Sequence, residues 1–383
     1  MKGKKILKRL LKVCLVIIVL LIVAVGFINY RLSSYVKLPE GVVRVTNKDE
    51  YYKAIDKAIH NYDEKLIVAI TDMNDNSYYN IDTVEKVLMD NPELHEICTK
   101  AEGKQKKFTI PIEMEINFKY SDDVKTLKNR EKAVQANTKE IIKKVIKPGM
   151  KDYEKEVALH DYIVNNSKYD IRADKGTMPM VSNTAYGVLI NKLGACVGYS
   201  DAMKRLLNAA GIESKIIVGT GSDGGKKIGH AWNLVKIGGE YHHLDVTWDD
   251  PITEDGSNTV RHTYFNLSDS QIKRNHQWNG SKYVKCNSTK FNFQNLGLSE
   301  KDYKGNETTT IHNYDEFYSS IQQAVTSGKR EISMNILNYN KNVYDLESAV
   351  TKIYRSIGKA GRYSWTEDKD EIHNSKIITL TFE

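Results

Sequence analysis

Part of this 383-residue chain occurs twice, and the duplication limits the architectures open to it. A shift of 266 residues places TNKDEYYKAIDKAI, which begins at Thr46, over HNYDEFYSSIQQAV, which begins at His312. The alignment needs no gap, and identical residues recur at many of about forty positions, from Asn47 and Asn313 to Lys86 and Lys352, which is hard to attribute to chance. Because two copies are too few for a solenoid, we predict two related modules that bracket a different central segment.

Each copy has the same order of predicted elements: a helix, a short strand, a second helix and an extended pair. In the first copy these elements cover residues 49–60, 65–70 and 81–90 and a pair that ends near Tyr120. The second copy closes with SKIITLTFE, which alternates as a strand does. We therefore predict small α/β modules at 40–122 and 306–383. Neither holds a cluster of candidate catalytic residues, so packing, spacing or binding is their expected role.

The central segment, residues 125–300, has helical patterns first and strand patterns afterwards. Helices are predicted at 129–147, 151–166 and about 197–210, the last of which stops at Gly211. Strands are predicted at 214–219, 229–237 and 240–247. Helices followed by a run of antiparallel strands are typical of an α+β fold.

The net charge of +7 comes from the N-terminal end of the chain. Residues 1–31 hold seven cations and no acid: Lys2, Lys4, Lys5, Lys8, Arg9, Lys12 and Arg31. Subtracting them from the 56 basic residues leaves 49, which balances the 49 acidic residues. A nucleic-acid-binding protein needs an excess of positive charge on its folded part, so the composition gives no support to a nucleic-acid partner.

The same region predicts a membrane anchor. Val13 to Ile28 is an uncharged apolar run, VCLVIIVLLIVAVGFI, and with its margins it is long enough for one transmembrane helix. The cations in front of it predict a cytoplasmic N-terminus and an extracellular location for everything after residue 31. The alternative is a cleaved signal peptide, with Ala24 and Gly26 as small residues near the cut, and a secreted protein. An exported chain with so few cysteines indicates a bacterial source.

Cys196 is the candidate nucleophile among four cysteines that do not form a disulfide framework. It stands in GACVGY at the first turn of a predicted helix, where the macrodipole and free N–H groups stabilise a thiolate. We expect the flanking glycines to let a substrate backbone approach and the N–H groups to hold an oxyanion. The alternative is a small buried hydrophobic residue. Cys98 and Cys286 are interpreted as buried thiols rather than as a disulfide.

A predicted hairpin supplies the base and its orienting group. Gly238 and Gly239 separate two alternating strands, a strong signal for a two-residue turn. This register places Trp232 opposite Asp245, so that His230 and Asp245 are diagonal neighbours on one face. His243 falls on that face too and is the fallback base. His242 points the other way, so a metal shared by the two adjacent histidines is not expected.

These segments resemble a known family. TAYGVLINKLGACVGYSDAMKRLLNAAGI and GHAWNLVKIGGEYHHLDVTWDDP resemble the transglutaminase-like core of bacterial proteins, whose pattern is Gly-x-Cys-x-Gly-Tyr, His-x-Trp-Asn and Asp-x-Thr-Trp. ALHDYIVNNSKYD, from Ala158, resembles the preceding helix of that core, and VLMDNPELHEI, from Val87, is similar to a segment upstream of it in clostridial proteins. The resemblance covers residues 151–255 and implies a papain-like fold.

The resemblance also implies a mechanism. Cys196 is expected to attack an amide carbonyl and form a thioester, with His230 as the proton carrier and Asp245 fixing its tautomer. An amine acceptor then gives a cross-link, and water gives deamidation or peptide hydrolysis. We predict a transglutaminase-like enzyme acting on extracellular or cell-wall-associated protein or peptide substrates, without cofactor or metal. The alternatives are a cysteine protease or amidase of the same fold and a catalytically silent cell-surface binding protein.

Two further features have an expected place near the site. Gly219 to Gly225 is glycine-rich but lacks the Gly-Lys-Ser/Thr ending of a P-loop and precedes a strand. We interpret it as a mobile loop at the rim of the active site. Tyr186, ten residues before Cys196, is either a helper of the oxyanion site or, by the simpler interpretation, a packed aromatic residue.

Overall fold

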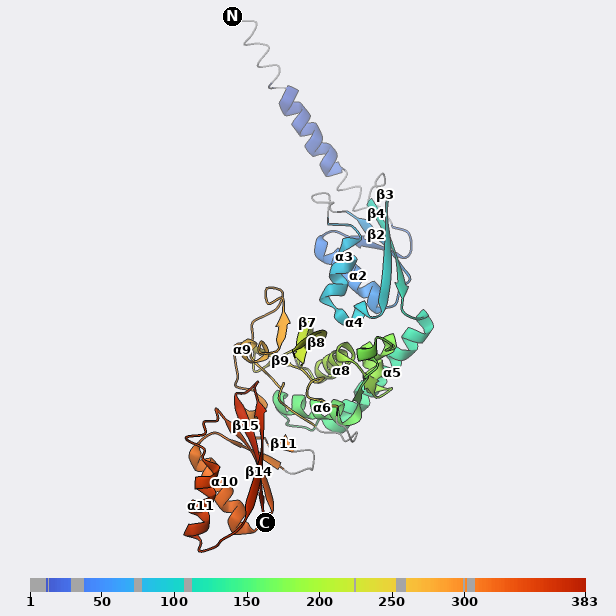
Figure 1. The fold of residues 1–383 in the computed structure, drawn as a ribbon. Coiled ribbons are helices and arrows are strands. Elements are labelled where there is room, and N and C mark those ends of the chain that lie inside the picture. The colour runs from blue at the N-terminus through green and yellow to red at the C-terminus, as the bar shows by residue number, and fades with distance from the viewer. Residues whose placement is uncertain are drawn as a thin grey trace, which may run out of the picture. The chain divides into compact units, whose positions relative to one another are not determined.

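The structure is a computed structural model that describes most of the chain (Figure 1). The described residues are 12, 14–28, 38–71, 78–106, 112–223, 225–252, 260–298, 300–301 and 307–383. Contacts divide the chain into two compact units, Met1–Asn129 and Arg130–Glu383.

The predicted membrane anchor finds no support in the structure. Within the described residues, no helix is both long and apolar enough to cross a membrane. Residues 1–11, 13 and 29–37, which hold both margins of the predicted span and most of its flanking cations, lie outside the described residues. The predicted location outside the cell stays a prediction.

The first unit contains a four-stranded sheet with helices against one face (Figure 1). The strand order is β1-β2-β4-β3, in which β1 and β2 are parallel and the other neighbours are antiparallel. The elements are β1 (Val42–Val45), α2 (Lys48–His60), β2 (Lys65–Ile70), α3 (Asp82–Asp90), α4 (Pro92–His95), β3 (Cys98–Lys106) and β4 (Ile112–Tyr120).

The end of the chain builds a second sheet of the same design, with α10 and α11 on one face (Figure 1). Its order is β11-β12-β13-β15-β14, with β12 and β13 parallel. The elements are β11 (Glu300–Lys301), β12 (Glu307–Ile311), α10 (Tyr314–Ser327), β13 (Glu331–Leu337), α11 (Leu346–Ser356), β14 (Tyr363–Asp370) and β15 (Ser375–Phe382).

The sequence repeat is matched by a repeat in structure. Val42 lies opposite Ile67 in the first sheet, and the parallel pair of the second sheet has the same register after the shift of 266. Asn47 caps α2 by accepting from the backbone N–H of Glu50, and the equivalent Asn313 caps α10 in the same way. The buried residues of α2 and α10 also correspond one to one: Tyr51, Ile55, Ala58 and Ile59 with Phe317, Ile321, Ala324 and Val325. The two segments therefore share topology, register and capping.

The central part of the second unit places helices against a four-stranded antiparallel sheet of order β10-β7-β8-β9. Its elements are α5 (Val124–Val145, whose first six residues fall in the first unit), α6 (Asp152–Asn166), β5 (Lys168–Tyr169), two 3₁₀ turns (Ala173–Lys175 and Met180–Asn183), α7 (Ala185–Leu189), β6 (Leu193–Gly194), α8 (Cys196–Ala209), β7 (Ser214–Asp223), β8 (Lys226–Ile237), β9 (Glu240–Leu244), α9 (Asp269–Ile272), β10 (His276–Trp278) and a 3₁₀ turn (Phe293–Asn295). The mixed architecture agrees with the prediction of helices first and strands afterwards.

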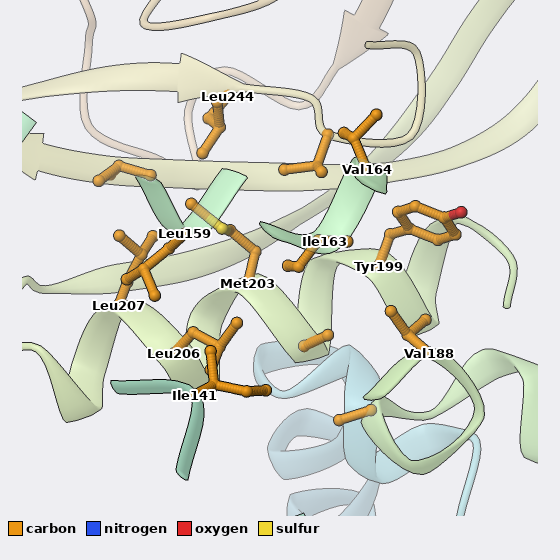
Figure 2. Close-up of a cluster of buried hydrophobic side chains, with 14 of the residues drawn as sticks. Ile141, Leu159, Ile163, Val164, Val188, Tyr199, Met203, Leu206, Leu207 and Leu244 are labelled. Atoms are coloured by element: carbon orange, nitrogen blue, oxygen red, sulfur yellow. The ribbon is translucent and has the colours of Figure 1, made fainter. Parts of the chain in front are cut away.

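Helix α8 lies at the centre of the main hydrophobic core. Tyr199, Met203, Leu206 and Leu207 on its buried face contact side chains from the neighbouring helices and from β9 (Figure 2). Those partners include Ile141, Leu159, Ile163, Val188 and Leu244. Gly211 has a φ of +83°, which favours glycine where the chain leaves the helix. This packing fixes the helix that begins at Cys196.

The glycine-rich segment is a strand, and its interpretation as a mobile loop is wrong for the described residues. Gly219 and Gly221 lie in β7, paired with β8 on one side and with β10 on the other. A Cβ atom on Gly219 would lie 2.8 Å from the Trp232 ring, and one on Gly221 would lie 2.5 Å from the Trp248 ring. The glycines therefore make room for two indoles. Gly224 lies outside the described residues.

The turn between β14 and β15 packs against the central sheet. Ile372 is buried in a cluster with Trp232, Leu234 and Leu267. Beside it, the Gln294 side chain lies 3.3 Å from Nδ1 of His373, which also contacts the Asp370 carboxylate at 2.7 Å. The last module of the chain thus contributes a side chain to the core behind β8.

Glu156 is a fully buried acid in α6. Its Oε2 accepts from Nδ2 of Asn266 at 2.7 Å, and its Oε1 has no partner among the described residues. Burial raises the pKa of Glu156 to about 8, so the side chain is largely neutral at pH 7. A raised pKa in the folded state costs no stability below the ordinary value of 4.5 and a growing amount as the pH rises toward 8.

We predict that Glu156→Gln stabilises the protein at pH 7–8 by on the order of 2 kcal/mol relative to the unaltered chain. The amide keeps an acceptor for Asn266 and removes the titration. Urea unfolding at pH 4, 6 and 8 measures the difference, which should vanish at pH 4. A difference that stays constant with pH would show that packing, not protonation, sets the effect.

Candidate active site

Cys196 is the first residue of α8, as the sequence indicated, and is partly exposed. Asn233 on β8 ties this helix to the sheet by donating from Nδ2 to the backbone oxygen of Ser200 at 2.9 Å. The Ser200 hydroxyl in turn donates to the backbone oxygen of Cys196 at 2.8 Å. The strand that carries His230 is therefore fastened to the first turn of the helix that carries the thiol.

The glycines beside Cys196 serve the packing of the chain itself. A Cβ atom on Gly198 would lie 2.4 Å from the backbone oxygen of Ser182, and one on Gly194 would lie 2.3 Å from the side chain of Val188. The structure thus gives these glycines a role in packing, and their expected role in admitting a substrate backbone stays a prediction. They let the segment before α7 approach the nucleophile turn.

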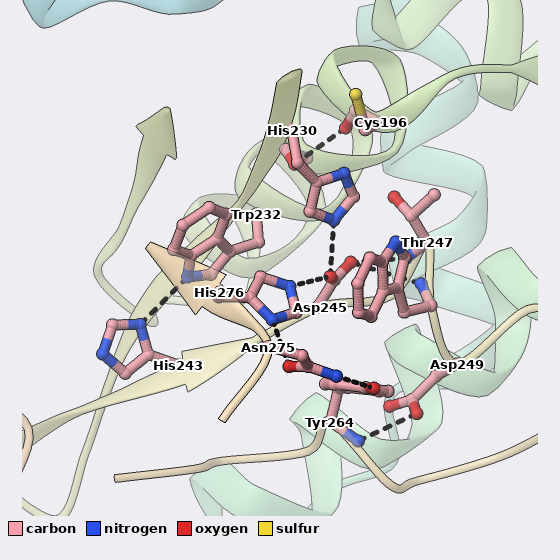
Figure 3. A network of polar contacts seen from close by, with 12 residues as sticks. Cys196, His230, Trp232, His243, Asp245, Thr247, Asp249, Tyr264, Asn275 and His276 are labelled. Carbon is pink, nitrogen blue, oxygen red and sulfur yellow. Dashed lines mark hydrogen bonds and ion pairs between the residues drawn. The ribbon is translucent and has the colours of Figure 1, made fainter. Parts of the chain in front are cut away.

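The hairpin has the predicted register. Ile237 lies opposite Glu240, and Gly238 and Gly239 both have positive φ, which a type I′ turn needs. His230 and Asp245 come together on one face, with Nε2 of the imidazole 2.6 Å from Oδ2 of the carboxylate (Figure 3). Nδ1 of His230 is left to face Cys196, which lies beyond the ring on the side away from Asp245 (Figure 3).

Asp245 is fully buried, and each of its oxygens accepts two hydrogen bonds (Figure 3). Oδ2 accepts from His230 and, at 3.0 Å, from Nε2 of His276. Oδ1 accepts from the backbone N–H groups of Thr247 and Trp248 at 3.1 and 3.2 Å. Burial alone would raise the pKa of Asp245, but the two imidazoles outweigh it and hold the pKa well below its usual range.

The electrostatics favour a charged His230. Burial alone would lower its pKa, but Asp245 outweighs burial and, with a smaller contribution from the Cys196 side chain, raises the pKa to about 10. The ring is thus an imidazolium at neutral pH, the partner that a thiolate requires.

His243, the fallback base, is already paired on both sides. Its Nδ1 accepts from Nε1 of Trp232 at 2.9 Å, and its Nε2 contacts Asp269 at 2.9 Å. Because an indole N–H only donates, the tautomer of His243 is fixed, and burial lowers its pKa. His242 faces the other side of β9, against Phe291, as predicted. Neither histidine is placed to take a proton from Cys196.

Two indole rings pack around His230 and its partner Asp245. The ring of Trp232 is stacked on that of His230 with centroids 5.9 Å apart, and Trp248 lies 5.1 Å from the same ring. Both indoles also contact His276, at 4.9 and 4.4 Å. They keep water from the His230–Asp245 pair, which strengthens its charge interaction.

A second buried network of histidines and carboxylates joins helix α6 to the loop that follows β9. His160 on α6 contacts Asp249 at 3.2 Å through Nε2 and Asp161 at 3.0 Å through Nδ1, and Nε2 of His262 contacts the same Asp161 oxygen at 2.8 Å. Burial alone would lower the pKa of His160, but the two carboxylates outweigh it and raise the pKa to about 9. This network anchors the loop after Asp245 to α6.

Three groups of side chains in the described part of the chain have donor atoms close enough together for a metal ion. They are His160, Asp161 and His262; His230, Asp245 and His276; and His243, Asp269 and Cys286. Within each group, hydrogen bonds already join the members, so we derive no metal chemistry from any of the three.

Sequence reasoning missed His276. Its place in the site depends on the pairing of β10 with β7, which sets His276 opposite Gly221, and no spacing in the sequence indicates that pairing. Tyr186 is a packed aromatic residue against the main core, with the Arg130 guanidinium over its ring at 5.7 Å. Cys98 and Cys286 are buried free thiols, as interpreted.

A comparison with known protein families finds a match to the segment that carries these residues. Residues 139–246 match the family model described as the transglutaminase-like superfamily. The chain contains a transglutaminase-like domain. The match includes Cys196, His230 and Asp245 and ends before His276.

The chain is similar over part of its length to several known proteins. Kyphoscoliosis peptidase of Mus musculus is 24% identical over 123 residues, which cover 30% of this chain and 18% of the peptidase. The chain therefore spans less than a fifth of that relative. A TGase of known structure is 16% identical, with 56% of this chain and 62% of that chain covered and a TM-score of 0.28. The Bacillus cereus arylamine N-acetyltransferase with a Cys-His-Glu triad is 13% identical. That similarity covers 29% of this chain and 48% of the acetyltransferase, with a TM-score of 0.24.

We predict that iodoacetamide labels Cys196 of the transglutaminase-like domain at pH 7 at least about 100-fold faster than Cys98 or Cys286. Burial raises the pKa of Cys98 to about 11 and that of Cys286 to about 12, so both stay protonated. The measurement is peptide mapping by mass spectrometry on a Cys14→Ser background, because Cys14 is exposed. Equal labelling of the three thiols in the folded protein would contradict a nucleophilic role.

Substitutions of the candidate triad should separate its members from the neighbouring histidines. His230→Ala and Asp245→Asn should each lower the rate of acyl transfer on the order of 10³-fold or more, since one removes the proton carrier and the other leaves the wrong tautomer. His243→Ala should keep activity per folded molecule within about tenfold of the unaltered chain, although it lowers stability. His242→Ala should lower the activity less than His243→Ala does. Activity is normalised to the folded fraction measured by circular dichroism. An equal loss in His243→Ala and His230→Ala would show that the base has been assigned wrongly.

Proposed function

We propose that this protein is a cysteine acyl-transfer enzyme that acts on amide bonds of protein or peptide substrates through a thioester on Cys196. The observation that carries the proposal is the His230–Asp245 pair, buried between two indoles beside a thiol at a helix N-terminus. The membership of residues 139–246 in the transglutaminase-like superfamily supports it.

Each side chain has a role in the proposed reaction. The Cys196 thiolate attacks the amide carbonyl, and the oxyanion forms near the first backbone N–H groups of α8, which have no acceptor inside the helix. The His230 imidazolium gives its proton to the leaving ammonia or amine. Asp245 holds the imidazole by Nε2 and stabilises its charge, so that Nδ1 exchanges the proton.

The fate of the thioester decides the type of enzyme. A primary amine as acceptor makes the protein a transglutaminase, whereas water makes it a deamidase or, on a peptide bond, a cysteine protease. The similarity to kyphoscoliosis peptidase supports hydrolysis as the second candidate. The extracellular location predicted from residues 1–31 would give the enzyme surface or cell-wall-associated substrates.

A glutamine peptide incubated with the protein, with and without a primary amine, tests the proposal by mass spectrometry. We expect loss of ammonia with incorporation of the amine, and the mass gain of deamidation when the amine is left out. Cleavage of the peptide backbone instead would identify a protease. Cys196→Ser is the control, and unchanged peptide in every arm, with a panel of peptides and amines, would favour a catalytically silent binding protein.

A further inference from the structure

A second imidazole contacts the carboxylate of the proposed triad. Nε2 of His276 lies 3.0 Å from Oδ2 of Asp245, the oxygen that also accepts from Nε2 of His230 (Figure 3). His276 is fully buried and is the first residue of β10, so it reaches Asp245 from a strand other than the one that carries His230. The two imidazoles therefore converge on one carboxylate oxygen.

The ring of His276 is itself held in place. Its Nδ1 lies 2.7 Å from Oδ1 of Asn275, and Nδ2 of Asn275 donates to the Tyr264 hydroxyl at 2.7 Å. The rings of Trp232 and Trp248 also contact it, with centroids 4.9 and 4.4 Å away. Two bonded nitrogens and two indoles against the ring hold His276 in its orientation toward Asp245.

The contact with His276 supplies one of the hydrogen bonds that the buried Asp245 carboxylate requires. A charge removed from water is retained only where hydrogen bonds replace its hydration. Asp245 has four such bonds, two from backbone N–H groups on Oδ1 and two from imidazoles on Oδ2. Without His276, one of the two side-chain donors is lost, and His230 alone among the side chains holds Oδ2.

We propose that His276 is a positioning residue, whose Nε2–H keeps Asp245 ionised and aimed at His230 and so supports the thiolate–imidazolium pair. This inference rests on the proposed function. His276 lies beyond residues 139–246, so the match to the family model does not include it.

The alternative is that His276 only fills the core. A pH profile distinguishes the two roles, because only support of the ion pair changes the pH at which Cys196 becomes reactive. The titratable groups that face this centre are Cys196 on α8, His230 on β8, Asp245 after β9, His276 on β10 and Tyr264, whose pKa burial raises above its usual range.

The experiment compares His276→Leu with His276→Gln in the full chain on the Cys14→Ser background. The leucine removes the donor and keeps the volume, whereas the glutamine amide presents an N–H at a similar reach. The second-order rate of Cys196 alkylation by iodoacetamide is followed from pH 5 to 9, together with the thermal midpoint. His242→Leu is the matched control, an equally buried histidine on the opposite face of β9.

In His276→Leu, we expect the pH at which the alkylation rate rises to increase by about one unit. At pH values below that rise, the rate is then about tenfold lower than in the unaltered chain. His276→Gln should stay within about threefold of the unaltered chain. A lower thermal midpoint with an unchanged profile in His276→Leu would overturn the inference. If that variant does not fold, His276→Asn, whose amide is one methylene shorter, takes its place against His276→Gln, and equal profiles of the two would overturn the inference. Failure of Cys196 to react selectively in the unaltered chain would overturn the proposed function itself.

Discussion

The 2.6 Å contact between His230 and Asp245 is the interaction on which the arrangement of the site depends. Each surrounding element contributes to it. The two-glycine turn sets the register that puts both side chains on one face, and the glycines of β7 admit the indoles that cover the pair. The backbone after β9 folds back to bond Oδ1 of Asp245, and β10 brings a second imidazole to Oδ2. A charge pair this deep is stable only because all these partners are present at once.

The loop that follows β9 acts as a junction between the sheet and the helices. Three of its acids each bind a different element: Asp245 binds the histidines of the sheet, Asp249 binds His160 on α6, and Asp250 binds the Tyr199 hydroxyl on α8 at 2.5 Å. Burial raises the pKa of Asp250 to about 6. Because α8 also begins at Cys196, the carboxylates of this loop connect the helix of the candidate nucleophile to His230, the candidate base.

Local pattern was enough to predict much of this site. The glycine pair fixed the hairpin register, and the capping position of Cys196 followed from helical spacing, since both are set by residues close together in the chain. Features that depend on distant partners were out of reach. His243 looked like a spare base until Trp232 and Asp269 occupied its two nitrogens, and the glycines of β7 looked like a loop until two indoles filled the space beside them. His276 required the pairing of β10 with β7.

Ile372 packs into the core behind the site but is synthesised after all the residues of the candidate triad. The ribosome completes Cys196, His230 and Asp245 well before it adds the turn between β14 and β15 that packs Ile372 into the cluster around Trp232. Until that turn emerges, the apolar cluster behind the indole lacks one of its buried side chains. A chain synthesised only as far as Asp245 therefore already holds Cys196, His230 and Asp245, while the apolar cluster around Trp232 still lacks Ile372.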